Sequence, residues 1–426
     1  MSDSSASLPV ISLPLKQQHY SCHACGNCCR DFTVQLNKDD LEKISGQDWV
    51  SRIGQEVTTV FRGVHYLRQK EDGACIFWMD DGRCRIHAEH GYEAKPIACQ
   101  LFPFALVPED GRIQSGISFA CQSVLENKGD TMSSHLSELR RMVRSVPDCQ
   151  GGAPLPYIEN RTRAQPRELK SLRGQLDRWM AQSAHPLHTR LDGLAWFASS
   201  LGRAKIHRVR DNRFDELLEL LFGVLPGELE LLPIDDASAR QASMMRQAAF
   251  ARIEDPKFNT AIARGRLRTT FDQLMRSRRF AKGSGAIPIQ AVDWPTVHFD
   301  QVDKVRSLGD SSDAESIDEL MTRYIRATVL GNRAWGAGYY GWPVDRGLQA
   351  LVLNVAVTGW LARVHAAAHG REEVLLEDAR AALGRVDRTS GRARWLGSSA
   401  ERLRAQYLQE DDGFRRIVSL NYLPSD

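Results

Sequence analysis

The sequence predicts an α+β protein in which a small cysteine-rich N-terminal domain precedes a mostly α-helical domain. Eight of the nine cysteines lie between Cys22 and Cys121, and the ninth is Cys149. Beyond about residue 166, apolar residues recur with the spacing of buried helix faces. A chain of 426 residues is long enough to hold both parts.

Composition divides the chain into four segments. Residues 1–19 have neither a basic start nor a long apolar run, so we expect a disordered lead-in and not a secretory signal. Residues 20–130 hold the clustered cysteines and are expected to form a metal-binding domain. Residues 131–165 are expected to be a linker, and residues 166–426 the mostly helical domain.

Charge and hydropathy restrict the partners. The formal net charge of +3, with 42% apolar and 26% charged residues, is typical of a soluble globular protein. Arg-rich stretches at 203–213 and 264–282 resemble solvated faces of amphipathic helices, so no nucleic-acid partner is expected. The most apolar stretch, 348–368, contains Asn354 and Arg363, which predicts a buried core helix and no membrane partner. We expect a cytoplasmic protein, in a compartment where disulfides are rare.

The stretch CHACGNCC places four cysteines between residues 22 and 29. Cys22 and Cys25 have the C-x2-C spacing of a metal-binding knuckle. Adding Cys28 gives C-x2-C-x2-C, the run that holds three corners of an iron–sulfur cluster in bacterial ferredoxins. Cys28 and Cys29 would point to opposite sides of an extended backbone, so we expect them to serve different sites or one ligand and one packing role.

The remaining cysteines lie at the ends of expected elements. A strand at 75–79 and an Asp-Gly turn are expected between Cys75 and Cys84, and Cys99 follows Pro96. A second hairpin with its tip at 109–111 would end near Cys121. The candidate metal ligands are therefore Cys22, Cys25, Cys28, Cys29, Cys75, Cys84, Cys99 and Cys121.

Other ligands and other uses of the thiols are less favoured. His87 and His90 follow Cys84 at ligand spacing, but thiolates are already abundant, so we favour surface residues of a helical turn. Disulfides and thiol catalysis are also disfavoured, because the compartment is reducing and no Cys-His-Asn constellation is evident.

The identity of the metal stays open between two readings. Eight thiolates suffice for two zinc ions, or for one iron–sulfur cluster with thiols to spare. We favour a [4Fe–4S] cluster on Cys22, Cys25 and Cys28, with Cys99 or Cys84 as the fourth ligand. The C-x3-C-x2-C spacing of radical S-adenosylmethionine enzymes is absent from the sequence.

These cysteines and the block KPIACQLFPF at 95–104 resemble the CxxCxxCC cysteine-cluster proteins, the YkgJ-like family, described as a zinc- or iron-chelating domain. The family block usually reads Arg-Pro-x-x-Cys-Arg-x-[FY]-Pro. Lys95 and Gln100 stand here in place of its two arginines, whereas Cys99 and the prolines match. The resemblance covers about residues 20–125.

The same module precedes a long helical region in flagellin lysine N-methylases, and this chain is similar in layout. The resemblance implies an S-adenosylmethionine-dependent protein-lysine N-methyltransferase that acts on a protein substrate. The sequence itself shows no S-adenosylmethionine-binding motif, since the glycine pair at 281–289 is not a G-x-G-x-G motif after a strand. The alternatives are a zinc-binding structural or interaction protein without catalysis, and a redox protein.

Helical periodicity predicts most elements of the second part. The loop at 331–345, rich in glycine and aromatic residues, is either a pocket wall or a structural turn, and we favour the turn. The expected helices are 214–225 (ending at Pro226 and Gly227), 239–253, 265–280, 317–330, 346–368, 372–386 and 396–411.

Overall fold

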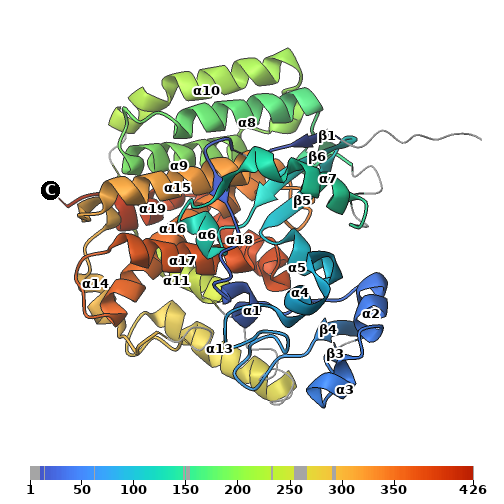
Figure 1. The fold of residues 1–426 in the computed structure, drawn as a ribbon. Helices are drawn as coiled ribbons and strands as arrows, with labels where there is room; N and C mark the ends of the chain where they lie inside the picture. The colour runs from blue at the N-terminus through green and yellow to red at the C-terminus, as the bar shows by residue number, and fades with distance from the viewer. Residues whose placement is uncertain are drawn as a thin grey trace, which may run out of the picture.

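The structure, a computed structural model, describes residues 10–425 except 14, 62, 147–148, 150–153, 232–233, 254–265 and 290–293. Helices dominate from residue 166 onward, and short strands and helices fill the N-terminal part (Figure 1). The strands are β1 Val10–Ser12, β2 His19–Tyr20, β3 Thr58–Phe61, β4 Val64–Leu67, β5 Phe104–Glu109, β6 Arg112–Ile117, β7 Asp130–Thr131, β8 Tyr157–Glu159 and β9 Thr162–Arg163. The predicted α+β class, with cysteine-bearing strands first and helices after, is confirmed.

The helices of the N-terminal part are short, and all those of the C-terminal part except α14 are longer. The first group is α1 Asn27–Asp31, α2 Lys38–Ser45, α3 Trp49–Ile53, α4 Arg85–His90, α5 Ile97–Leu101, α6 Gln122–Leu125 and α7 Leu136–Val143. The second group is α8 Pro166–Met180, α9 Leu187–Arg203, α10 Asn212–Leu231, α11 Ala239–Ile253, α13 Arg266–Lys282, α14 Phe299–Lys304, α15 Ala314–Leu330, α16 Val344–Ala368, α17 Leu376–Thr389, α18 Ser399–Gln409 and α19 Gly413–Tyr422.

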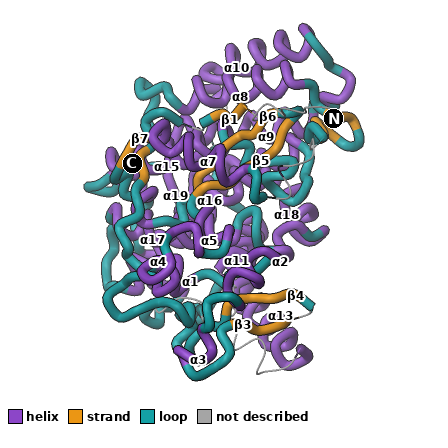
Figure 2. The backbone as a smooth tube through the Cα atoms, turned by 45° about the vertical axis from the view of Figure 1, so that its right-hand side comes forward, coloured by secondary structure: helices purple, strands orange, loops and turns teal. Residues whose placement is uncertain are grey.

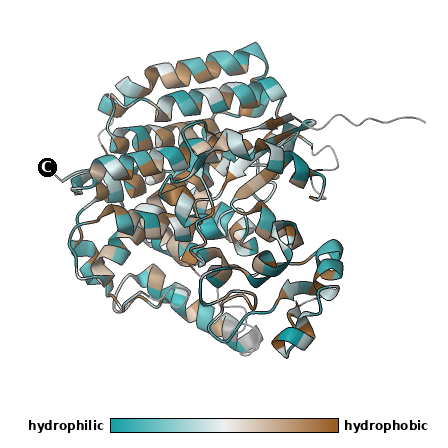
Figure 3. Ribbon diagram, in the orientation of Figure 1, coloured by the Kyte–Doolittle hydropathy of each residue, from teal (hydrophilic) through white to brown (hydrophobic). Residues whose placement is uncertain are grey.

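Helix α16 is the centre of the helical body. Nearly all of its side chains are buried, because it is apolar on every face and other helices surround it. By length and composition α16 could cross a membrane, but 94% of its apolar stretch is buried inside the protein. The prediction of a buried core helix at 348–368 is therefore confirmed. Helices α8, α9 and α10 are layered on one side of the body, and α8 and α10 alternate apolar and polar residues (Figure 3).

The hairpin predicted around 109–111 is confirmed. Strands β5 and β6 pair antiparallel from Phe104–Ile117 to Glu109–Arg112, and β1 adds to β6 in parallel. Asp110 and Gly111, at the two-residue turn, both have positive φ, which the right-handed twist of a hairpin favours.

Regular elements are present in the described residues of the segments expected as a lead-in and a linker. Part of residues 10–19 forms β1 and the start of β2, and Leu15 and Gln18 are buried. The segment expected as a linker contains α7, β8 and β9, and Leu139 of α7 is buried in the main core. Both segments are held by partners distant in sequence, which local composition does not reveal.

The N-terminal part contributes to two separate cores. Leu36, Trp49, Phe77 and Ile86 belong to a small core that includes β4 and helices α2 to α4. Phe104, by contrast, lies in the main core with the helical body. Figures 1 and 2 both place α3, β3 and β4 at the end of the molecule opposite α10. The predicted 20–130 segment is thus divided between a small unit and the main body.

Two local predictions also need correction. Helix α10 continues through Pro226 to Leu231, because Leu225 and Leu229 on either side of the proline pack against the core. Their burial offsets the roughly 3 kcal/mol that an interior proline costs.

The segment 75–79 is not a strand but a series of turns with isolated bridges at Cys75 and Trp78. The predicted helices at 239–253, 265–280, 317–330, 346–368, 372–386 and 396–411 are present with ends shifted by a few residues.

Candidate metal centre

The knuckle loop of Cys22 and Cys25 packs against the segment that carries Cys75 and Cys84. Gly26 has φ +76°, and a Cβ at this position would lie 2.7 Å from Nε1 of Trp78. A Cβ at Gly82 would lie 2.9 Å from the Ala24 carbonyl oxygen. Glycines are therefore needed on both sides of this contact.

The buried Nε1 of Trp78 is a hydrogen-bond donor without a partner among the described residues. An indole N–H can only donate, and leaving it buried and unpaired costs free energy. It lies beside Gly26, next in sequence to Cys25. A thiolate sulfur of the knuckle is an acceptor of the kind that this N–H lacks.

Cys28 and Cys29 lie in helix α1, so the expectation of an extended backbone there is wrong. Consecutive helical side chains point about 100° apart, which still separates the two thiols in direction. The Cys29 thiol donates to the Cys28 sulfur and, with Lys95 nearby, lowers the pKa of Cys28 to about 7, although burial opposes this shift. The same hydrogen bond, together with burial, raises the pKa of Cys29 well above its usual range.

Cys75 is joined directly to Cys29 through the backbone. The Cys75 N–H donates to the Cys29 carbonyl oxygen over 2.7 Å. Burial raises the pKa of Cys75 to about 12, although the Phe77 N–H donates to its sulfur. An N–H two residues further on that points at a cysteine sulfur is the geometry of a metal-binding knuckle. Cys84 is the N-cap of α4, and its backbone forms an isolated antiparallel β-bridge with Trp78.

Cys121 has the same kind of support from a helix start. It is the N-cap of α6, and the N–H groups of Val124 and Ser123 donate to its sulfur. Burial outweighs these bonds and raises the pKa of Cys121 to about 12. The Ser123 hydroxyl in turn accepts the N–H of Ser21 over 3.4 Å, which brings Cys22 towards Cys121.

Cys99 lies on the short helix α5. Burial raises the pKa of its thiol above the usual range, and Cys75 and Cys84 add to the shift. The ring of Phe102, just after α5, lies 5.0 Å from that of Phe32, just after α1. This contact holds the Cys99 segment against the helix of Cys28 and Cys29.

The electrostatic neighbours of the thiols indicate two groups of cysteines, and Cys28 is a neighbour of both. The pKa of Cys121 responds to Cys25 and Cys28, and that of Tyr20 to Cys22, Cys121 and Cys28. The pKa values of Cys29, Cys75 and Cys99 respond to members of the second group and to Cys28. The first group is Cys22, Cys25, Cys28 and Cys121, and the second is Cys29, Cys75, Cys84 and Cys99.

The sulfurs of each group have not converged to ligand spacing. In the described chain, no three cysteine sulfurs lie within 4.8 Å of one another. All nine cysteines are reduced. The two groups fit thiolate metal sites in their chemistry: each offers four sulfurs, and N–H donors already point at Cys75 and Cys121. Side-chain rotation must bring each set together around an ion.

Two lysines, Lys95 and Lys70, lie near several of the cysteines. Lys95 helps to lower the pKa of Cys28 and offsets part of the rise in the pKa of Cys99, and it occupies the position of a family arginine. The buried Gln100, at the second such position, instead donates to the carbonyl oxygens of Glu93 and Lys95, over 3.1 Å and 2.6 Å. Positive charge near a four-thiolate site offsets its net negative charge.

Two arginines connect the cysteine unit to the helical body, and sequence reasoning missed them. The Arg388 guanidinium lies 5.2 Å from the Phe32 ring, and that of Arg392 lies 5.4 Å from Phe32 and 5.9 Å from Phe102. Such cation–π contacts stabilise by about 0.5–2 kcal/mol each. In the sequence, only the aromatic residues near Cys29 and Cys99 indicate that such contacts could form.

The histidines and Cys149 lie outside both groups. His87 and His90 are exposed on α4, as predicted, where His90 contacts the Trp49 ring. Much of 148–156, around Cys149, lies outside the described residues. The loop at 331–345 is a structural turn, with Trp335, Tyr339 and Trp342 buried.

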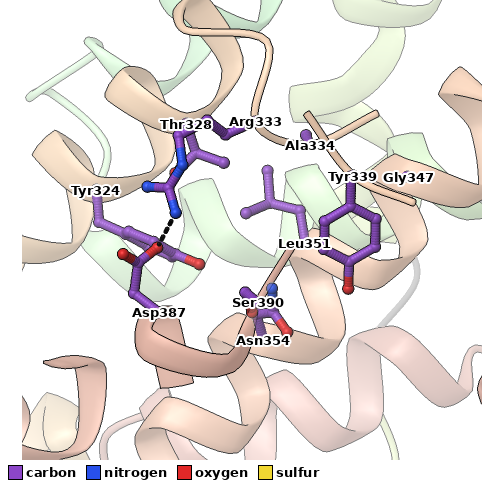
Figure 4. A pocket seen from close by; sticks show the side chains of 10 residues that line it. All are labelled: Tyr324, Thr328, Arg333, Ala334, Tyr339, Gly347, Leu351, Asn354, Asp387 and Ser390. Carbon is purple, nitrogen blue, oxygen red and sulfur yellow. Dashed lines mark ion pairs between the residues drawn. The ribbon is translucent and has the colours of Figure 1, made fainter. Parts of the chain in front are cut away.

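A small cavity lies beside this turn, lined in part by Tyr324, Arg333 and Asp387 (Figure 4). Its volume of about 10 Å³ suits one water molecule and not a cofactor. The hydroxyls of Thr328 and Ser390 face it without hydrogen-bond partners among the described residues, as groups that bind a buried water would.

Comparison with known proteins identifies the N-terminal part alone. Residues 21–127 match the family described as "CxxCxxCC: Putative zinc- or iron-chelating domain". An uncharacterized protein of Methanocaldococcus jannaschii is 30% identical over 112 residues, which is 26% of this chain and 38% of that protein. The match thus spans well under half of either protein. No solved structure matches the chain.

Proposed function

We propose that the chain is a metal-binding protein with two four-thiolate centres. The observation that carries this proposal is that the eight thiols form two sets of electrostatic neighbours. Cys28 is a neighbour of both sets and is assigned to the first by its C-x2-C-x2-C spacing. Four thiolates complete a tetrahedral zinc site and equally complete the ligand set of a [4Fe–4S] cluster. The zinc- or iron-chelating family match of residues 21–127 supports metal binding.

The first group is proposed to hold the iron–sulfur cluster. Cys22, Cys25 and Cys28 have the ferredoxin spacing, and Cys121 replaces the fourth ligand expected from sequence, Cys99 or Cys84. Cys121 is favoured because Cys25 is among the thiols that raise its pKa, whereas the thiols that raise the pKa of Cys99 are Cys75, Cys84 and Cys28. The second group is proposed to hold a single ion.

The proposed role of the metal is to hold the small N-terminal core against the helical body. That core is small, and bound metal supplies folding free energy to units of this kind. Phe32 and Phe102, which follow helices α1 and α5, connect this core to the body. Their rings contact the guanidinium groups of Arg388 and Arg392. Catalysis is not needed for this role.

A second candidate function is protein-lysine N-methylation with S-adenosylmethionine, as the layout of the chain implies. One cavity of about 370 Å³ favours it, since this volume lies in the range of small-molecule sites. Asp235, Asp236 and Asp303 line that cavity beside Lys304, Arg306, Arg363 and Arg416, and Asp235 is paired with Arg416 over 3.1 Å. The cavity therefore offers groups of both signs to the sulfonium, amino and carboxylate groups of the ligand. Saturable binding of S-adenosylmethionine, weakened at least tenfold by Asp303→Asn, is expected under this candidate; no binding by the wild-type chain would exclude it.

The proposal is tested by the metal and acid-labile sulfide content of the full chain, purified without air. We expect iron with comparable sulfide, plus one further ion. Cys25→Ser should remove the sulfide and leave the further ion, whereas Cys75→Ser should do the opposite. Cys149→Ser is the matched control and should keep both.

Each outcome decides a separate part of the proposal. Zinc at both centres, without sulfide, would contradict the cluster and keep the two groups. Identical losses in Cys25→Ser and Cys75→Ser would contradict the division into groups. Unchanged metal content in both variants would contradict thiolate binding altogether.

A further inference from the structure

A second kind of metal-ligating cluster lies in the helical body. Among the described residues, His365, His369 and Asp378 form a three-residue group whose ligand atoms lie within 4.8 Å of one another. The two histidines are four residues apart at the C-terminal end of α16 and share one helix face. Their ring centroids are 4.3 Å apart. Asp378 lies in the first turn of α17.

The hydrogen bonds of both rings determine which nitrogen carries the hydrogen. Nδ1 of His365 lies 2.5 Å from Oδ1 of Asp378, and Nδ1 of His369 lies 2.8 Å from the His365 carbonyl oxygen. Asp378 also accepts from the Leu375 N–H and the Arg371 guanidinium, so it is an ionised acceptor. Carboxylate and carbonyl oxygens cannot donate. Each neutral ring therefore donates from Nδ1 and leaves the lone pair of Nε2 available.

This arrangement is typical of histidines that bind metal. A metal-binding imidazole almost always donates its second N–H to a carboxylate or a backbone carbonyl, which orients the ring and raises its basicity. His365 uses the carboxylate of Asp378, and His369 uses a backbone carbonyl. The negative end of the α16 dipole also favours a cation at this position.

We propose that His365 and His369 bind one divalent transition-metal ion through Nε2 of both rings. Asp378 orients His365 and is not itself a ligand, and water completes the coordination. Imidazole ligands suit zinc, copper and nickel. Two imidazoles on a tetrahedral zinc ion place their nitrogens about 3.4 Å apart, and a nitrogen of each ring already lies within 4.8 Å of a nitrogen of the other ring.

The charges around the rings permit a cation. Arg371 is a cationic side chain beside this group, and it is paired with Asp378 and, over 2.9 Å, with Glu377. The two carboxylates together carry more negative charge than the one guanidinium carries positive charge. His369 is exposed, so an ion reaches the site from solvent without opening the core.

The test is calorimetric titration of the full chain, as purified with its thiolate sites filled, with zinc ions. We expect one additional zinc ion, bound more weakly than by four thiolates. His369→Gln should weaken this binding at least tenfold, because only one imidazole remains. His65→Gln, an exposed histidine on β4, is the matched control and should bind as the wild type does. Unchanged thermal melting would show that both variants keep the fold.

A second measurement uses the wild-type chain alone. Zinc addition should shift the ¹⁵N resonances of Nε2 in His365 and His369. The hydrogen on Nδ1 of each ring should stay in place. The absence of an additional zinc ion, its persistence in His369→Gln, or ¹⁵N shifts at other histidines instead would each overturn the proposal.

Discussion

The backbone N–H of Cys75 donates to the carbonyl oxygen of Cys29 over 2.7 Å. This bond joins the cysteine run of helix α1 to a segment far along the chain. Beside it, the knuckle loop rests on Trp78 through Gly26. The protein fold itself therefore holds the two segments in contact. Metal binding would require side chains to move, and not whole segments.

Gly26→Ala is expected to weaken both metal binding and folding. The new Cβ would be strained by a φ of +76° and would meet Trp78 Nε1 at 2.7 Å. We expect a loss of about 2–4 kcal/mol in the free energy of unfolding, measured by denaturant titration with metal bound.

Gly54→Ala is the matched control for this substitution. Gly54 has a similar φ of +78°, but a Cβ there would meet no atom within 4 Å. It should cost only about 1 kcal/mol, from the backbone conformation alone. Equal losses for the two variants would contradict close packing of the knuckle loop on Trp78.

Metal binding should strengthen as the pH rises. Burial raises the pKa of Cys75 and of Cys121 to about 12, so the metal-free protein keeps these thiols protonated at neutral pH. Metal binds the thiolate, so loading must release those protons, and the apparent affinity must increase with pH. Zinc titrations of the metal-free chain in buffers of different ionisation enthalpy should reveal at least one proton released per ion. A pH-independent affinity between pH 6 and 8 would contradict this account.

Breaking the Arg333–Asp387 ion pair is expected to destabilise the junction between sheet and helices. The two side chains are buried, 3.0 Å apart, and Arg333 also donates to the Ile117 carbonyl at the end of β6 (Figure 4). Removing one partner leaves a buried charge unpaired, which costs about 3–5 kcal/mol. Asp387→Asn should show this loss in denaturant unfolding.

An exposed ion pair supplies the control for Asp387→Asn. Arg306 and Glu373 lie 3.4 Å apart at the surface. Glu373→Gln should leave the unfolding midpoint unchanged, because solvent screens this pair. A similarly small effect of Asp387→Asn would show that the buried pair does not secure the junction.

Asp345 should make the protein less stable as the pH rises. Burial raises its pKa to about 6, and its Oδ1 has no hydrogen-bond partner among the described residues. Because the folded pKa exceeds the unfolded value, the folded state binds more protons, and stability falls as pH rises from about 4 to 6. Asp345→Asn should increase the free energy of unfolding by about 2 kcal/mol at pH 7, and by much less at pH 4. An equal effect at both pH values would contradict the assignment.

Local signals in the sequence predicted the regular elements well. Asp110 and Gly111 between apolar runs predicted the β5–β6 hairpin, because a two-residue turn of this kind determines its own register. Helices α11, α15 and α16 were predicted from apolar periodicity, since each buries a continuous face or its whole surface. The cysteine spacing also predicted the family domain found at residues 21–127.

Features that depend on distant partners were not predictable in this way. β1 exists because it pairs with β6, and nothing within residues 10–12 indicates that partner. The assignment of Cys121 to the group of Cys25 depends on the contact of Ser21 with Ser123 across the fold. The bonds from His365 to Asp378 likewise join the ends of two helices. Sequence periodicity carries no information on such pairings.

X-ray absorption spectroscopy of the metal in the protein, purified without air or added metal, tests the central claim most directly. The account predicts about four sulfur neighbours for each metal at about 2.3 Å, with no nitrogen ligand. In Cys75→Ser it predicts that the contribution of the single ion is lost and that of the cluster is unchanged. A coordination shell composed mainly of nitrogen and oxygen, or one unchanged by Cys75→Ser and Cys25→Ser alike, would contradict the two thiolate centres.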